Sequence, residues 1–305
     1  MPHYNTIKLP GVLAEKSVEI EKSSLKISDY IAFTKLRLSL LVLFSAGLGY
    51  LIAGQTFNTK TFICLLIGGF CITAASNGLN QIFERELDKM MKRTMGRPLP
   101  KDKMSVTEAY ILVIFFAVGG SLFLWFGTNP LCTLLSISSL FLYSFVYTPL
   151  KRVSSIAVFV GAIPGALPPL LGYVAAKGTI DYMAMLLFAT QFMWQFPHFW
   201  AIAWRLNEDY GKAGFSLLPF KTGHSKQNAF QILVYTLFLI PVSIVPYFVG
   251  YMNLVTAIIT VVAGIAFLVP AIRLYRGLSM KAASVLMFSG FLYLPVVQIF
   301  MWLNI

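Results

Sequence analysis

The residues best suited to chemistry lie between Asn77 and Pro100, where an apolar stretch gives way abruptly to polar side chains. Asn80, Glu84 and Asp88 follow one another at intervals of four, so on a helix they fall within about 80° of one face, and Asn77 falls in the same sector. Oxygen ligands gathered on one face are what a hard divalent cation such as Mg²⁺ binds. The pattern therefore predicts that Asn80, Glu84 and Asp88 hold a metal at the mouth of an apolar segment.

Cationic residues follow this face at once: Lys89, Lys92, Arg93 and Arg97. Cations beside metal-binding carboxylates suit a ligand that is itself anionic and metal-bound, above all a diphosphate. The alternative is a solvated, basic loop at the end of a membrane helix. The shared face of amide and carboxylate side chains favours the binding site over that alternative.

A second polar cluster lies farther along the chain, and its members fall within about 40° of one helix face: Gln191, His198, Arg205 and Asp209. Such side chains are costly in a membrane helix unless they line a cavity, so we expect this helix to face the first cluster across a polar pocket. The alternative is that His198 hydrogen-bonds to a neighbouring helix while Arg205 and Asp209 are interfacial. A third signal, the pair Lys151–Arg152, either clamps a phosphate or anchors its loop.

The composition indicates the elements that carry these residues. Of the 305 residues, 57% are hydrophobic and only 12% are charged, whereas a soluble domain carries about 25% charged residues. We expect an all-α, polytopic membrane protein with a cytosolic tail over residues 1–28 and a single transmembrane domain over residues 29–305. Apolar segments long enough to span a bilayer predict nine helices, near 31–54, 60–82, 106–126, 131–149, 153–176, 181–205, 228–250, 252–273 and 281–303.

The distribution of positive charge predicts the topology. Lys60 and Lys177 fall on one side of the predicted membrane, and the other 22 of the 24 Lys and Arg residues fall on the opposite side. By the positive-inside rule, the N-terminus and the large polar loops face the cytosol. The net charge of +12 is spread between apolar spans, so we expect a lipid bilayer as partner and no nucleic acid.

The strings NQIFERELDKMMKRTMGRPLP, YTPLKR, PGALPPLLGY and WQFPHFWAIAWRLNEDYGKAG also carry a family resemblance. The first resembles the leading motif of the UbiA superfamily of intramembrane prenyltransferases. Together the four resemble the protohaem IX farnesyltransferase (haem O synthase) family within it. The resemblance covers about residues 31–303 and implies a UbiA-like bundle in the bacterial cytoplasmic (inner) membrane, with the active site facing the cytosol.

The chain departs from the superfamily pattern at a few positions. Glu84 stands where the first motif commonly has aspartate, and Arg205 stands at the earlier of two aspartates in the second motif, which leaves Asp209. The first helix carries Lys35-Leu36-Arg37 in place of Lys-Pro-Arg.

The resemblance implies a reaction in which farnesyl diphosphate and haem b give haem o and diphosphate, with Mg²⁺ as cofactor and haem b as substrate. It implies that Asn80, Glu84, Asp88 and Asp209 are the catalytic metal ligands. The implied substrate contacts are Asn77, Lys92, Arg93, Arg97, Lys151, Arg152, His198 and Arg205, with His198 positioning the porphyrin. A haem A synthase is the implied downstream partner. Two rivals stay open: a UbiA-type enzyme acting on a quinone precursor or chlorophyllide, and a small-molecule transporter.

Overall fold

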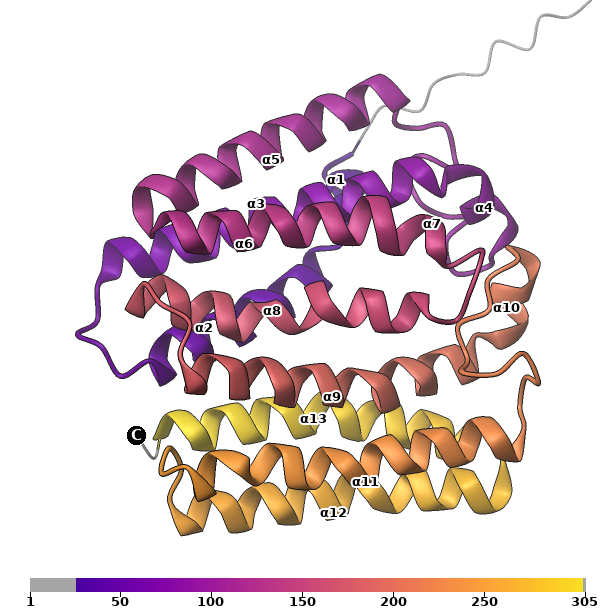
Figure 1. The fold of residues 1–305 in the computed structure, drawn as a ribbon. Coiled ribbons are helices and arrows are strands. Elements are labelled where there is room, and N and C mark those ends of the chain that lie inside the picture. Colours follow the sequence, from indigo (N-terminus) through magenta and orange to yellow (C-terminus); the bar gives the residue numbers. More distant parts are fainter. Residues whose placement is uncertain (1–25, 304–305) are drawn as a thin grey trace, which may run out of the picture.

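The computed structural model describes residues 26–303, and every regular element within them is a helix. The long helices are α2 (Leu36–Ile52), α3 (Thr59–Phe83), α5 (Val106–Gly127), α6 (Pro130–Phe141), α8 (Ala157–Lys177), α9 (Tyr182–Arg205), α11 (Lys226–Phe248), α12 (Leu254–Gly277) and α13 (Met280–Leu303). The short elements are α1 (Ile27–Thr34), α4 (Arg85–Met90), the π-helix η1 (Leu142–Tyr147), α7 (Thr148–Leu150) and α10 (Asn207–Lys212). The long helices lie side by side, with α4, α7 and α10 gathered at one end of the bundle (Figure 1).

The segments expected from the sequence all fall on helices, the first on α1 and α2 together and the fourth on α6, η1 and α7. Among the described residues, seven helices are long and apolar enough to cross a membrane, or eight if the bent α1–α2 pair is one span. Helix α9 is equally long but is not among them, because its glutamines, histidine and arginine lower its apolar content. The count of nine spans therefore stays a prediction. The expected tail over residues 1–28 lies almost entirely outside the described residues.

Most long helices begin at a polar side chain that accepts a hydrogen bond from a first-turn backbone N–H. These N-caps are Asn58, Ser105, Asn129, Asp181, Ser225 and Asn253. A cap satisfies one of the backbone donors that a helix start leaves unpaired. The caps explain why apolar segments separated by only a few residues begin where they do.

Helices α2 and α8 touch through their backbones. A Cβ atom on Gly49 would collide with the carbonyl of Pro169, and one on Gly172 would collide with the carbonyl of Ala46. Glycine is required at such a close approach because any side chain would push the helices apart. The Gly and Pro residues of this segment predict an irregular helix, but α8 is continuous despite three internal prolines.

The first span is bent by 49° between α1 and α2. Lys35 stands at the bend with φ of +48°, a left-handed conformation that ends one helix and starts the next. The carbonyls freed at the end of α1 accept hydrogen bonds from α3, with Gln81 Nε2 donating to Phe33 O (2.6 Å) and Asn77 Nδ2 to Thr34 O (3.3 Å). Polar residues of α3 therefore fix this bend.

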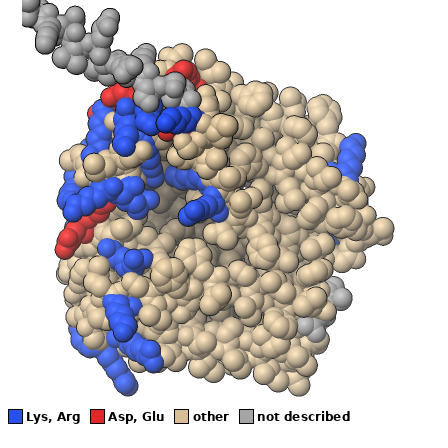
Figure 2. All heavy atoms as spheres, turned by 180° about the vertical axis from the view of Figure 1, so that it is seen from behind, with Lys and Arg blue, Asp and Glu red and all other residues tan. Residues whose placement is uncertain are grey.

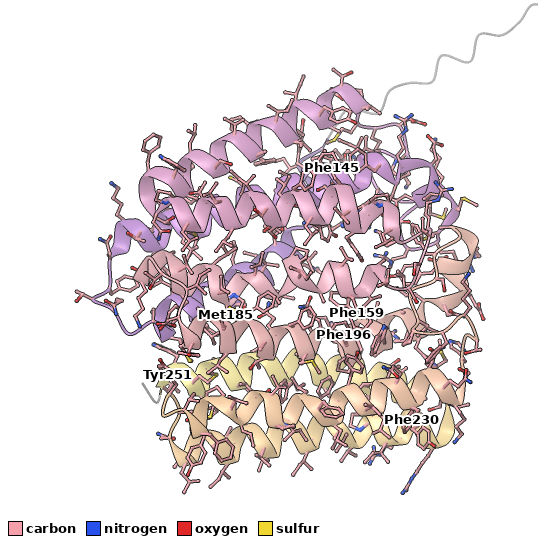
Figure 3. All side chains as sticks on the ribbon, in the orientation of Figure 1. Phe145, Phe159, Met185, Phe196, Phe230 and Tyr251 are labelled. Carbon is pink, nitrogen blue, oxygen red and sulfur yellow. The ribbon has the colours of Figure 1, made fainter. Side chains whose placement is uncertain are left out.

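An aromatic cluster joins α8, α9 and α11. Phe159 and Phe196 lie against each other across α8 and α9 (Figure 3), with ring centroids 4.6 Å apart. Trp200 and Tyr235 complete the cluster, their centroids 4.9 Å apart. Aromatic rings bury large apolar areas, so this cluster stabilises the position of α9, which carries the second polar motif.

Candidate active site

The face formed by Asn80, Glu84 and Asp88, here called the carboxylate face, runs across the junction of α3 and α4. Helix α3 ends at Phe83, but the backbone bonds from Glu84 N to Asn80 O (3.0 Å) and from Asp88 N to Glu84 O (2.7 Å) keep helical spacing. The three side chains therefore stay on one side of the chain, as the sequence predicts. All three are buried, with exposed fractions of 2%, 5% and 0%.

Asn80 connects this face to two other elements. Its Nδ2 donates to Glu84 Oε2 (2.9 Å) and to Thr148 Oγ1 of α7 (3.3 Å). Its Oδ1 accepts from Lys35 Nζ at the α1–α2 bend (3.3 Å). The sequence does not single out Lys35 as a site residue, because a lysine at the start of a membrane helix is ordinarily an interfacial anchor.

Each carboxylate has a cationic partner. Lys151 Nζ lies 2.5 Å from Glu84 Oε1, and Arg97 Nη1 lies 2.6 Å from Asp88 Oδ2. Burial raises the pKa of the Asp88 carboxyl, with Arg97 opposing that effect, and burial lowers the pKa of the Lys151 amine, with Glu84 opposing it. Buried charges are tolerated when they are paired in this way.

The carboxylate face still has unused oxygens. Asp88 Oδ1 and Glu84 Oε1 are buried without a hydrogen-bond partner, although Glu84 Oε1 lies close to the Lys151 ammonium. A buried carboxylate oxygen without a partner carries a desolvation cost that a bound cation would remove. With the Asn80 amide beside them, these atoms form an oxygen-only donor set of the kind that suits Mg²⁺. Within residues 26–303, however, no three His, Cys, Asp or Glu side chains gather as a metal group.

Asp209 does not join Glu84 and Asp88 in such a group. Its carboxylate accepts hydrogen bonds from the backbone N–H groups of Lys92 (2.9 Å) and Arg93 (3.2 Å), and Lys212 Nζ lies 3.7 Å away. Burial alone would raise the pKa of the Asp209 carboxyl, but these donors outweigh it and hold that pKa below its usual value. Asp209 thus fixes the loop that carries the cations, and it is the point where the two sequence clusters meet.

Aromatic rings from the π-helix η1 lie beside the cations. Lys151 Nζ is 4.9 Å from the ring centroid of Tyr147 and 5.4 Å from that of Phe215, both within cation–π range. Tyr143 packs on Tyr147 with centroids 5.1 Å apart. Gly161 leaves room for the Tyr147 ring, since a Cβ on Gly161 would come within 2.7 Å of that ring. A π-helical turn often marks a functional site.

His198 lies apart from the carboxylate face, between α9 and α13. Its ring stacks on Trp194 (centroids 4.8 Å apart) and meets Phe291 edge-on (4.5 Å). The ring hydrogen-bonds to the backbone of Met287 in α13, as the alternative in the sequence analysis has it, and its Nδ1 is buried without a hydrogen-bond partner. Arg205, at the exposed end of α9, donates to Met287 Sδ of α13 at 3.2 Å. The expected polar pocket between the second and sixth predicted helices is therefore not formed by these two residues.

The remaining predicted residues have separate places. Asn77 holds the α1–α2 bend, while Lys92, Arg93 and Arg152 are exposed at the same end of the bundle as the carboxylate face. Figure 2 shows Lys and Arg gathered along one edge of the molecule, beside a hollow in the surface. This end of the bundle is basic, which favours an anionic ligand.

The helical bundle is that of a known family. The chain matches the UbiA prenyltransferase family over residues 41–303 and belongs to that family. It is 48% identical over 272 residues to the protoheme IX farnesyltransferase of Cytophaga hutchinsonii, covering 88% of this chain and 95% of that protein. It is 36% identical over 271 residues to the mitochondrial protoheme IX farnesyltransferase of Arabidopsis thaliana, covering 88% of this chain and 62% of that protein.

Solved structures share the fold. The chain of a digeranylgeranylglyceryl phosphate synthase study superposes with a TM-score of 0.76 at 18% identity, covering 91% of this chain and 98% of that one. A UbiA homologue from Archaeoglobus fulgidus bound to GPP and Mg²⁺ superposes with a TM-score of 0.68 at 14% identity, covering 90% and 99%.

The role of Asp209 can be tested by replacing it with alanine. Hydrogen bonds to a charged acceptor are stronger than neutral ones, so Asp209→Ala should speed hydrogen–deuterium exchange at the Lys92 and Arg93 amides by roughly tenfold or more. Residue-resolved exchange measured by mass spectrometry checks this, with Glu208→Ala as the matched control. Unchanged exchange at both amides would show that Asp209 does not hold the loop.

Proposed function

We propose that this protein transfers the farnesyl group of farnesyl diphosphate to a vinyl group of haem b, with addition of water, to give haem o and diphosphate. The observation that carries the proposal is the buried carboxylate face, where Asp88 Oδ1 has no hydrogen-bond partner and where Lys35, Lys151 and Arg97 lie against the other polar atoms. That arrangement suits a metal-bound diphosphate. The choice of haem as acceptor rests on similarity to proteins named protoheme IX farnesyltransferase along nearly their whole length.

Asn80, Glu84 and Asp88 would hold Mg²⁺, which neutralises the negative charge that grows on a departing diphosphate. In this account Asp209 acts from the second motif by orienting the loop that presents Lys92 and Arg93. Lys151 and Arg97 already lie against the carboxylates at 2.5 and 2.6 Å. They would exchange those partners for phosphate oxygens when substrate binds, with Arg152 at the rim and Asn77 keeping the bend in place.

The bond between C1 of the farnesyl chain and the diphosphate oxygen breaks, and diphosphate takes the electron pair. The vinyl π electrons form the new carbon–carbon bond to the allylic cation. The oxygen of water then bonds to the resulting porphyrin-side cation and releases a proton. Tyr143 and Tyr147 present aromatic faces beside the site and would stabilise the allylic cation while excluding bulk water.

The acceptor side is assigned to α9. His198 would position the porphyrin, because its Nδ1 is a buried nitrogen without a partner. Arg205, exposed at the basic end of the bundle, would pair with a propionate. A haem A synthase downstream is the implied consumer of the product.

We place the protein in the bacterial cytoplasmic membrane with nine spans, the N-terminus and the active site in the cytosol. Among the described residues, Lys60 and Lys177 lie at the ends of α3 and α8 that are remote from α4 and α10, and the other basic side chains lie at the near end. This bias supports a cytosolic carboxylate face. A quinone-directed relative would share the metal site but lack a role for His198. A transporter would need no carboxylate face.

Asp88→Ala should abolish turnover and leave a folded, membrane-inserted protein. Loss of one metal carboxylate removes several kcal/mol of transition-state stabilisation, so we expect a fall on the order of 10³-fold in rate. Farnesyl transfer to haem b in detergent with saturating Mg²⁺ is the measurement, and a melting curve reports folding. Glu86→Ala, which removes an exposed carboxylate from the same helix, should keep full activity. Near-normal turnover of Asp88→Ala would rule out the metal assignment.

The topology can be tested by placing a single cysteine at Asp102, an exposed position in the loop after α4. In a variant whose native cysteines are replaced, Asp102→Cys should react with a membrane-impermeant maleimide in inverted vesicles only. A cysteine at Lys177 should react from the outer face of intact cells. Labelling at Asp102 in intact cells would reverse the orientation.

His198→Ala separates the haem contact from a purely structural bridge. If His198 positions the porphyrin, haem b affinity measured by a Soret titration should fall about tenfold or more, with farnesyl diphosphate affinity unchanged. Glutamine at the same position should not restore haem affinity. Unchanged haem affinity with a lowered melting temperature would assign His198 to the α9–α13 contact alone.

A further inference from the structure

A second buried polar group lies in the bundle, away from the carboxylate face. Ser45 of α2 donates from Oγ to Gln191 Oε1 of α9 (2.7 Å), and Gln298 Nε2 of α13 donates to Ser45 Oγ (2.9 Å) and to Gln191 Oε1 (3.1 Å). We call Ser45, Gln191 and Gln298 the polar triad. All three are at least 95% buried, so their hydrogen bonds are made among protein groups and join three helices.

A fourth helix is tied to the polar triad by a backbone group. Gln191 Nε2 donates to the carbonyl of Gly165 in α8 (2.8 Å). The residue four positions later is Pro169, which has no backbone N–H and so cannot satisfy that carbonyl within the helix. The glutamine replaces the missing donor, and the polar triad becomes a cross-link between α2, α8, α9 and α13.

On the side of the polar triad that faces the carboxylate face, α2 and α13 carry exposed side chains. At the polar triad itself their side chains are buried. Leu38 lies two turns before Ser45 on the same face of α2, yet it is 46% exposed while Ser45 is 4% exposed. On α13, Phe291 likewise lies two turns before Gln298 on the same face, and it is 39% exposed while Gln298 is 2% exposed. Because Ser45 and Gln298 contact each other and each exposed residue shares a face with its buried counterpart, Leu38 and Phe291 lie on the sides of α2 and α13 that turn toward one another before the two helices meet. Figure 2 shows a hollow beside the basic edge.

Beyond the polar triad the packing is continuous. Every residue of α2 from Ser45 to Tyr50 is buried, and the contacts of Gly49 with Pro169 and of Gly172 with Ala46 leave no gap between α2 and α8. A chain that enters from the carboxylate face therefore meets a closed end at the polar triad.

The distance along α2 from the carboxylate face to the polar triad matches the length of a farnesyl chain. Lys35, which contacts Asn80, precedes Ser45 by ten residues, and at 1.5 Å of rise per residue the two lie about 15 Å apart along α2. An extended chain advances about 1.2 Å per bond, so the main chain of a farnesyl group with its ester oxygen spans about 14 Å. A chain with a fourth isoprene unit would be several ångströms too long.

We propose that the polar triad is the floor of the prenyl chamber and limits the donor to three isoprene units. The proposal rests on the proposed function in taking a prenyl diphosphate as donor, and it names the residues that set its length. The polar atoms of the floor are satisfied by one another, and an apolar tail offers no hydrogen bond to replace theirs. The side chains of the polar triad would therefore stay in place, and a prenyl chain with a fourth isoprene unit would not fit.

The test measures binding, so it does not depend on the acceptor. Dissociation constants are measured by calorimetry for unreactive thiolodiphosphate analogues with two, three and four isoprene units, in the presence of Mg²⁺. Wild type should prefer the three-unit analogue over the four-unit one. In Gln298→Ala the ratio of the four-unit to the three-unit dissociation constant should fall about tenfold or more. Pockets discriminate by at least that factor for small changes in length. Gln298→Met, which keeps the volume and loses the hydrogen bonds, should keep only part of the preference and fall between wild type and Gln298→Ala.

A second variant protects the test against loss of folding in Gln298→Ala. Val42→Trp adds bulk at a half-buried position three residues before Ser45, about 10 Å beyond Lys35 along α2. Because the chain of the two-unit analogue spans only about 10 Å, this variant should weaken the three-unit analogue about tenfold while the two-unit analogue binds as before. The proposal is overturned if wild type binds none of the analogues, or if Gln298→Ala leaves the length preference unchanged. Equal effects of Val42→Trp on both analogues, as expected for a tail that leaves between α2 and α13 into lipid, would also overturn it. Failure of the proposed function would show separately, as an absence of prenylated haem.

Discussion

The pairing of buried charge at one end of the bundle is the constraint on which the other features of the site depend. Asp88 and Glu84 are almost wholly buried, and an unpaired carboxylate there would be strongly destabilising. Their partners come from different parts of the chain, Arg97 from the loop after α4 and Lys151 from the end of α7. Pairing therefore draws α4, its loop and the η1–α7 segment together. In the proposed function the same cations would exchange a carboxylate for a phosphate.

Backbone groups without helical partners shape the remainder of the molecule. The α1–α2 bend frees carbonyls that accept from Asn77 and Gln81 of α3, and Pro169 frees the carbonyl that accepts from Gln191. In a membrane such groups must be satisfied by protein. The polar residues that the sequence marks as possible ligands are thus of two kinds. Some, such as Asn77 and Gln191, donate hydrogen bonds to backbone carbonyls. Others, such as Asp88, keep an oxygen without a hydrogen-bond partner.

The sequence was sufficient for features with a local period. The carboxylate face follows from four-residue spacing, and the helical segments follow from apolar length, so both are recovered in the structure. Contacts through space were not accessible in this way. Nothing local links Lys35 to Asn80, or Asp209 to the amides of Lys92 and Arg93, and the stripe shared by His198 and Arg205 does not reveal that α13 covers it. The polar triad likewise depends on three helices meeting, which spacing along one helix does not encode.

Product analysis shows whether the UbiA-type site at this end of the bundle joins a farnesyl chain to haem. Purified protein is incubated with farnesyl diphosphate, Mg²⁺ and haem b, and the porphyrins are separated and weighed by mass spectrometry. We expect a haem heavier by one farnesyl group and one hydroxyl, formed as diphosphate is released. Recovery of haem b unchanged, while a quinone precursor supplied in its place is prenylated, would contradict it.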